Sequence, residues 1–79
     1  MTSGELLERV CQALRARLPG CTVEGEFTDE DDGRKAARAV VTGSAWRPVG
    51  EFVMTGPTNA AAVRALAESL GVSIEEGGR

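Results

Sequence analysis

The sequence predicts a single α+β domain, a two-layer α/β sandwich in which helices cover one face of an antiparallel meander sheet. Apolar residues recur at helical spacing in residues 5–18 and 60–70, whereas the segments between them alternate with a period of two. Glycine, proline and clustered acids separate these segments and indicate turns. The expected order is therefore α-β-β-β-α. The predicted elements are a helix from Thr2 to Leu18, strands from Cys21 to Thr28, Ala36 to Thr42 and Val49 to Thr55, and a helix from Thr58 to Leu70.

The first predicted helix has a start signal, an apolar face and a stop signal. Thr2 and Glu5 have the spacing of a capping box, in which each side chain accepts a hydrogen bond from the other residue's backbone. Pro19 and Gly20 end the helix, because proline disfavours helical geometry before it and glycine tolerates positive φ. The face expected to be buried consists of Leu6, Leu7, Val10, Cys11, Leu14 and Leu18.

The three predicted strands follow in sequence and form a meander. In the first strand, alternation places four side chains inward and polar ones outward. A charged turn follows, and a connection that contains Gly43, Ser44 and Pro48 then joins the second and third strands as a hairpin. The inward positions of the first strand are Cys21, Val23, Gly25 and Phe27.

The charged turn contains four consecutive acids, Asp29 to Asp32, which raises the question of a calcium loop. Such a loop needs glycine at its sixth position and a carboxylate at its twelfth. Counted from Asp29, the glycine is fifth and the twelfth residue is Val40. We therefore interpret this segment as a solvated turn that keeps the sheet edge soluble, and we predict no metal site.

The second predicted helix is rich in alanine and has clear limits. Thr58 or Asn59 can cap its first amides, and Gly71 stands where a helix-ending glycine is expected. After Gly71, the sequence leaves open a short last strand from Val72 to Glu75. The face expected to be buried consists of Val63, Leu66, Ala67 and Leu70.

This order of elements resembles the topology of the double-stranded-RNA-binding domain, over about residues 5–70. The resemblance concerns element order and not motif residues. Where that family has a Gly-Pro-x-His type loop, this chain has Asp31-Asp32-Gly33-Arg34, and where it has a lysine cluster, this chain has Thr58-Asn59-Ala60-Ala61. The resemblance implies the fold, with the phosphate-binding residues of the family missing.

Length and charge limit what the domain can do. Seventy-nine residues bury one thin core, and the formal charge of −3 gives no general attraction for nucleic acid. The larger apolar residues, among them Phe27, Phe52 and Met54, suffice for one layer of helix on one face of a sheet. A deep substrate pocket is not expected, so the sequence favours action at a surface. Abundant alanine, glycine, valine and arginine are typical of a high-GC bacterium or its phage.

The cysteines and the N-terminal segment predict a cytoplasmic protein. Cys11 and Cys21 are interpreted as reduced, buried thiols, because secreted domains of this size normally carry more cysteines. Glu5, Glu8 and Arg9 interrupt any signal-peptide-like run. No stretch approaches the roughly 20 apolar residues of a membrane span, so no membrane partner is expected.

The residue inventory argues against catalysis. There is no histidine and no tyrosine, which leaves carboxylates, one lysine and two thiols as acid-base groups. Lys35 lies in the charged turn, and Gly56-Pro57-Thr58 lacks the spacing and the lysine of a phosphate-binding loop. We predict that the protein is not an enzyme and has no catalytic residue, no cofactor and no metal.

Trp46, Arg47 and Pro48 are the candidate partner-binding residues. Tryptophan and arginine are enriched at the centres of protein interfaces, and a rigid proline lowers the entropic cost of binding. A single tryptophan in a small domain can also fold back over its own core. The first hypothesis for function is therefore a protein-binding or regulatory module, with the structural role of Trp46 as the alternative.

Two further hypotheses remain at this stage. One is a nucleic-acid-binding protein that uses basic residues of the first helix and the second strand. The other is a homodimer formed through an exposed strand edge or through the alanine-rich helix. The candidate nucleic-acid contacts are Arg15, Arg17, Arg34, Lys35 and Arg38.

Overall fold

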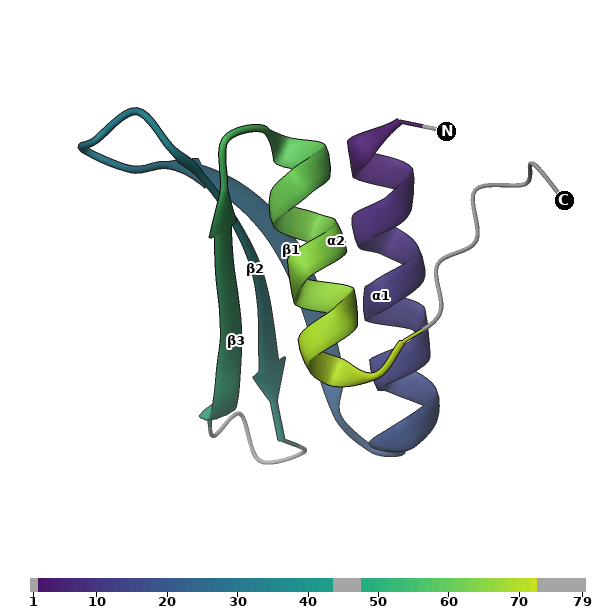
Figure 1. The fold of residues 1–79 in the computed structure, drawn as a ribbon. Helices are drawn as coiled ribbons and strands as arrows, with labels where there is room; N and C mark the ends of the chain where they lie inside the picture. The colour runs from purple at the N-terminus through teal and green to yellow at the C-terminus, as the bar shows by residue number, and fades with distance from the viewer. Residues whose placement is uncertain (1, 44–47, 73–79) are drawn as a thin grey trace, which may run out of the picture.

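The computed structural model describes residues 2–43 and 48–72, and these residues confirm the predicted α-β-β-β-α order. The two helices pack against each other and against one face of an antiparallel sheet with strand order β1-β2-β3 (Figure 1). The architecture is therefore the expected two-layer sandwich with an open meander sheet. The elements are α1 (Ser3–Arg17), β1 (Thr22–Asp29), β2 (Lys35–Thr42), β3 (Pro48–Gly56) and α2 (Asn59–Leu70).

The sheet is regular except at one end. β1 and β2 pair without a shift along their whole length, and the β2-β3 register shifts once, between Val41 and Thr42. The turn from β1 to β2 contains Gly33 at φ +87°, a backbone conformation that favours glycine. In this turn Glu30 donates its N–H to the Arg34 carbonyl at 2.8 Å, which closes the hairpin. The acid-rich segment is thus the predicted strand connection.

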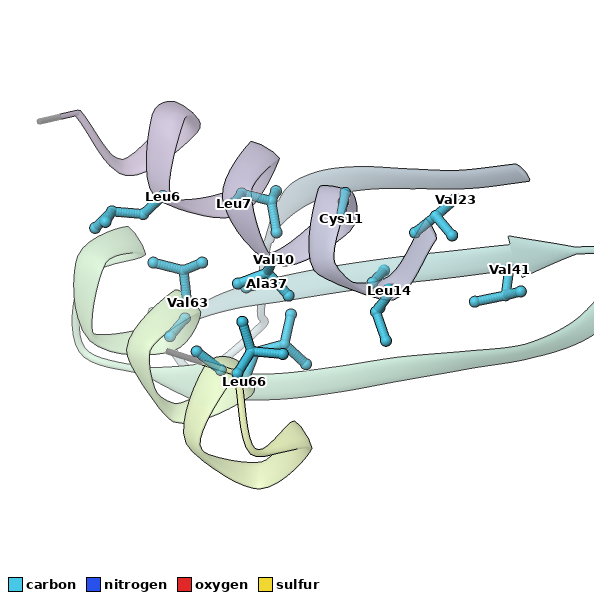
Figure 2. Packing of buried hydrophobic residues seen from close by; sticks show 14 residues of the cluster. Leu6, Leu7, Val10, Cys11, Leu14, Val23, Ala37, Val41, Val63 and Leu66 are labelled. Atoms are coloured by element: carbon cyan, nitrogen blue, oxygen red, sulfur yellow. The ribbon is translucent and has the colours of Figure 1, made fainter. Parts of the chain in front are cut away.

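The core lies between the helices and the sheet, and it combines large helical side chains with small strand side chains. Figure 2 shows leucines and valines of α1 and α2 directed toward β1 and β2. On β2, the inward positions are Ala37, Ala39 and Val41, which are fully buried. Alanine at these positions lets the helices lie close to the middle strand. The predicted buried face of α1 is confirmed, with Leu18 partly buried, and α2 buries Ala62, Val63, Leu66 and Ala67, with Leu70 partly buried.

The helix ends have the predicted caps. Thr2 and Glu5 form a capping box: Thr2 donates its N–H to Glu5 Oε1 at 2.7 Å, and Glu5 donates its N–H to Thr2 Oγ1 at 3.2 Å. The bond from the Thr2 backbone lowers the pKa of the Glu5 carboxyl. Gly71 is left-handed, and its N–H and that of Val72 bond to the carbonyls of Glu68 and Ala67. Thr58 caps α2 by accepting the Ala61 N–H at 3.1 Å.

The structure differs from the sequence-based expectations at two places, and a third expectation falls mostly outside the described residues. Phe52 and Met54 are expected in the core and are instead exposed, because they lie on an edge strand of the described sheet. Cys11 is buried as predicted, but Cys21 is only half-buried, because it precedes β1 at the rim of the core. The strand considered from Val72 to Glu75 falls outside the described residues beyond Val72, which is buried.

Candidate protein-interaction site

The outer edge of β3 is the most apolar exposed part of the described structure. Three consecutive large side chains, Phe52, Val53 and Met54, are 38%, 39% and 36% exposed. Among residues 2–43 and 48–72, β3 pairs with β2 on one side only and is therefore an edge strand of the described sheet. Unpaired N–H and C=O groups on the free side of an edge strand are a template for another strand. We call these three residues and the free side of β3 the β3 edge.

The strand register shows that the apolar side chains of the β3 edge lie on both faces of the sheet. Phe52 is opposite Ala39, and Met54 is opposite Ala37, so both point to the helical side. Val53 is opposite Arg38 on the other side. A layer packed on one face of the sheet would bury only one of these two sets. A strand added along the edge would contact both.

The approach of α2 to β3 is set by Gly56, at the end of the strand. A Cβ atom at Gly56 would lie 2.9 Å from the Ala62 backbone nitrogen and 3.0 Å from the Ala61 Cβ, so the absent side chain makes room for the first turn of α2. Gly56 itself is buried, whereas Gly50 to Thr55 are exposed. The helix therefore holds one end of β3 and leaves the apolar middle of the strand accessible.

The outer face of the sheet is polar and centred on Arg38. Its Nη1 atom lies 3.0 Å from Glu51 Oε2 on β3, and its Nε atom lies 3.6 Å from Glu26 Oε2 on β1. One guanidinium thus lies between two carboxylates across three strands. Val53, next to this row, is the apolar residue by which the β3 edge extends onto the outer face.

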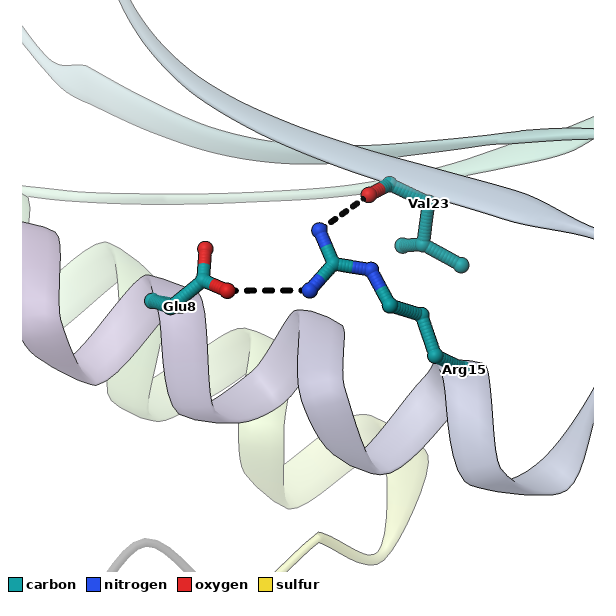
Figure 3. A network of polar contacts seen from close by, with 3 residues as sticks. All are labelled: Glu8, Arg15 and Val23. Atoms are coloured by element: carbon teal, nitrogen blue, oxygen red, sulfur yellow. Dashed lines mark hydrogen bonds and ion pairs between the residues drawn. The ribbon is translucent and has the colours of Figure 1, made fainter.

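The opposite edge of the sheet, β1, has a different character. Glu24 and Glu26 are exposed along it, and Asp29 at its end pairs with Lys35 at 2.6 Å. Arg15 of α1 donates from Nη2 to the Val23 carbonyl at 2.7 Å and from Nη1 to Glu8 at 2.9 Å (Figure 3). The hydrogen bond to Glu8 raises the pKa of Arg15. Charges and a side-chain hydrogen bond therefore protect β1 from strand addition.

The residues predicted to bind a partner lie at the start of β3. Trp46 and Arg47 fall outside the described residues, and Pro48 is the first residue of β3, opposite Thr42. Because the chain runs from Trp46 directly into β3, the predicted residues and the β3 edge are consecutive in sequence. The role of Trp46 stays a prediction.

The basic residues predicted to contact nucleic acid occupy four separate places. Arg17 donates to the carbonyls of Leu70 and Gly71, at 2.7 and 3.2 Å, and joins the end of α1 to the end of α2. Arg15 bonds to β1 near the start of that strand, while Arg34 and Lys35 lie at the turn where β1 ends, and Arg38 lies mid-sheet between carboxylates. The structure does not bring the five residues into one basic surface. The nucleic-acid hypothesis stays untested.

Other features of the described residues are modest. Shallow hollows lie on the exposed sides of the helices, one on α2 around Arg64 and Glu68 and one on α1 around Glu8 and Arg9. Within residues 2–43 and 48–72, no group of three or more Cys, Asp or Glu side chains is placed to hold a metal ion. Neither helix has the length and apolar character needed to cross a membrane.

Comparisons with protein-family models, with curated proteins and with solved structures found no match for this chain. At the two places where the double-stranded-RNA-binding family was compared, the side chains serve local structure: Asp32 accepts the Arg34 N–H at 3.0 Å, and Thr58 caps α2.

Sequence reasoning missed the β3 edge, although a signal was present. Strict alternation in a half-buried strand separates apolar residues by polar ones. Between Glu51 and Thr55 this strand has three apolar residues in a row, so one face had to carry an apolar side chain outward. From the sequence, Phe52 and Met54 are counted among the apolar residues available for the core, and no inward or outward face is assigned to this strand.

Proposed function

We propose that this protein is a small, non-enzymatic protein-binding module that recognises its partner by strand addition at the β3 edge. The observation that carries the proposal is the exposure of Phe52, Val53 and Met54 on both sides of one edge strand. Scattered exposed apolar residues are ordinary on protein surfaces, but contiguous ones mark interaction sites. Three of them on an unprotected edge favour a partner strand.

Strand addition accounts for both polar and apolar features of this edge. A partner strand would accept and donate the free backbone hydrogen bonds of β3, while its alternating side chains would cover Phe52 and Met54 on one side and Val53 on the other. Within β3, proline occurs only at the first position, so the residues from Val49 onward keep their N–H donors. Recognition would thus combine main-chain bonding with apolar contact.

Trp46, Arg47 and Pro48 would extend this surface at the start of β3. Replacement of Trp46 by alanine is then expected to weaken partner binding at an unchanged melting temperature. The measurements are a binding isotherm with the captured partner and a thermal melt of the free variant. A lowered melting temperature with binding retained would assign Trp46 to the core of its own domain instead.

We further propose that the module acts in the cytoplasm of its host, a high-GC bacterium or its phage. Cys11 and Cys21 are both free thiols, and a reducing compartment preserves this state.

Affinity capture from the native host tests the proposed function directly. The bait pair is the wild type and Val53→Glu, which places a carboxylate in the middle of the β3 edge. Thr22→Glu is the matched control, since it adds the same charge at an exposed position of the β1 edge. We expect mass spectrometry to find proteins that wild type and Thr22→Glu retain and Val53→Glu loses. An identical set with all three baits would reject the β3 edge as the binding surface.

A further inference from the structure

We propose that a second copy of this chain is the partner that binds the β3 edge, in an antiparallel pair of β3 strands across a two-fold axis at Val53. This inference rests on the proposed function and specifies its partner. Its basis is the complementarity of β3 to itself in residue type and charge. A two-fold pairing is closed, so it gives a dimer and not a filament.

In this register, residues at equal distances from Val53 face each other, so each of the three exposed apolar side chains meets an apolar one. Val53 faces Val53 of the second copy, and Phe52 faces Met54. Since Phe52 and Met54 lie on the helical side of the sheet, two such pairs would form one cluster there. The two Val53 side chains would meet on the outer face. Aromatic and β-branched cross-strand pairs of this kind stabilise a sheet.

The charges of β3 favour the same register. Glu51 is the single charged residue of the strand, and its carboxylate already bonds to Arg38 of its own chain. In the proposed pair it faces Thr55 of the second copy, so no like charges are opposed. A two-fold pairing of β1 strands about Gly25 would instead place Glu24 opposite Glu26 of the other copy. Like charges directly opposite each other destabilise a strand pair, so β3 is the edge suited to self-association.

The resulting dimer has a defined shape. The two sheets would join through β3 into one continuous antiparallel sheet, and the two-fold axis would keep both pairs of helices on the same face. Because α2 packs on β2 and β3, the α2 helices would be the inner pair. An interface made by one strand edge is smaller than the roughly 1,600 Å² of a standard protein interface, so association should depend on concentration.

Sedimentation equilibrium with charge variants at Val53 tests this pairing. In the free chain Val53 is opposite Arg38, so Val53→Glu gains a favourable neighbour and should remain folded. In the dimer the same residue faces its own copy, so two carboxylates would be opposed. Val53→Lys opposes two ammonium groups in the same way, and its fold is checked by circular dichroism. Mixing the two variants would pair opposite charges across the axis.

We expect the wild type and Thr22→Glu to shift from the mass of one chain, 8.3 kDa, toward twice that mass as concentration rises. Val53→Glu and Val53→Lys should each stay at the mass of one chain, and their equimolar mixture should again approach twice that mass. A wild type that is monomeric at all concentrations, or a dimer that Val53→Glu leaves intact, would overturn this inference. If such a monomer still captures another protein through Val53, the proposed function stands without self-association.

Discussion

The two edge strands of the sheet, β1 and β3, differ in how far their side chains protect the backbone groups that face away from the sheet. Each edge strand has backbone groups that face away from the sheet and could pair with another chain. β1 carries the carboxylates of Glu24 and Glu26, and Arg15 bonds to one of its carbonyls. β3 carries one charge, Glu51, followed by three exposed apolar residues. This difference is the basis of our proposal that β3, and not β1, is the edge that binds a partner.

The same comparison separates apolar residues that hold the fold from those that remain accessible. Leu66 on α2 is fully buried in the core, whereas Phe52 is larger and more than one third exposed. We expect Leu66→Ala to lower the free energy of unfolding by about 2–5 kcal/mol, the usual cost of a buried leucine. Phe52→Ala should cost less than about 1 kcal/mol at concentrations where the chain is monomeric. Urea unfolding of both variants measures this, and equal losses would place Phe52 in the core.

A second pair of variants compares how closely the helices approach each edge strand. A Cβ atom at Gly56 of β3 would meet the backbone of α2 at 2.9 Å, and one at Gly25 of β1 would meet the side chains of Leu7 and Cys11 at 2.7 and 2.9 Å. Side chains can shift and helix backbone cannot, so Gly56→Ala should destabilise more than Gly25→Ala, both within about 1–3 kcal/mol. Denaturant midpoints give the order. A larger loss at Gly25 would show that β1 is the more tightly covered strand.

Arg15 tests the protection of β1. Arg15→Ala removes the bond to the Val23 carbonyl as well as the pair with Glu8, so we expect it to lower the free energy of unfolding more than loss of the ion pair alone. Glu8→Ala removes the exposed ion pair alone and should cost less, about 0–0.5 kcal/mol. Thermal melts of the two variants measure the difference. Equal effects would mean that the bond to β1 contributes nothing.

The reactivity of the buried Cys11 thiol shows whether α1 stays packed over β1. Burial raises the pKa of its thiol, so the reactive thiolate is suppressed in the folded state. The folded pKa lies above the unfolded one, so this group's contribution to stability is full below the unfolded pKa and is lost as pH rises through the folded value. We expect iodoacetamide to modify half-buried Cys21 well before Cys11. Equal rates by mass spectrometry would show that α1 opens readily from the sheet.

Much of the fold could be predicted because local signals agreed with one another. Thr2 with Glu5 marked the start of α1, Gly71 marked the end of α2, and the change of period marked β1. The observed element limits differ from the predicted ones by at most one residue, which is a cap residue of a helix or an end residue of a strand.

The sequence predicted that the candidate site is a surface near the β2-β3 hairpin, but it did not predict which residues of β3 are exposed. Sequence pointed to a surface near the β2-β3 hairpin and chose Trp46, Arg47 and Pro48 by residue type. The exposure of Phe52 depends on its place on an edge strand, and the order of the strands in the sheet is a property of the tertiary fold. In the same way, the five basic residues could be grouped in sequence, but the side chains of Arg15, Arg17, Lys35 and Arg38 bond to carboxylates and carbonyls of the folded chain.

Amide hydrogen exchange at two protein concentrations tests most directly the claim that β3 is the associating edge. Free edge amides exchange readily, and strand pairing protects them. We predict that amides within residues 50–55 become more slowly exchanging as concentration rises, while amides of β1 keep the same rates. In Val53→Glu, which is expected to stay monomeric, neither edge should respond to concentration. The same lack of response at residues 50–55 of the wild type would contradict the claim.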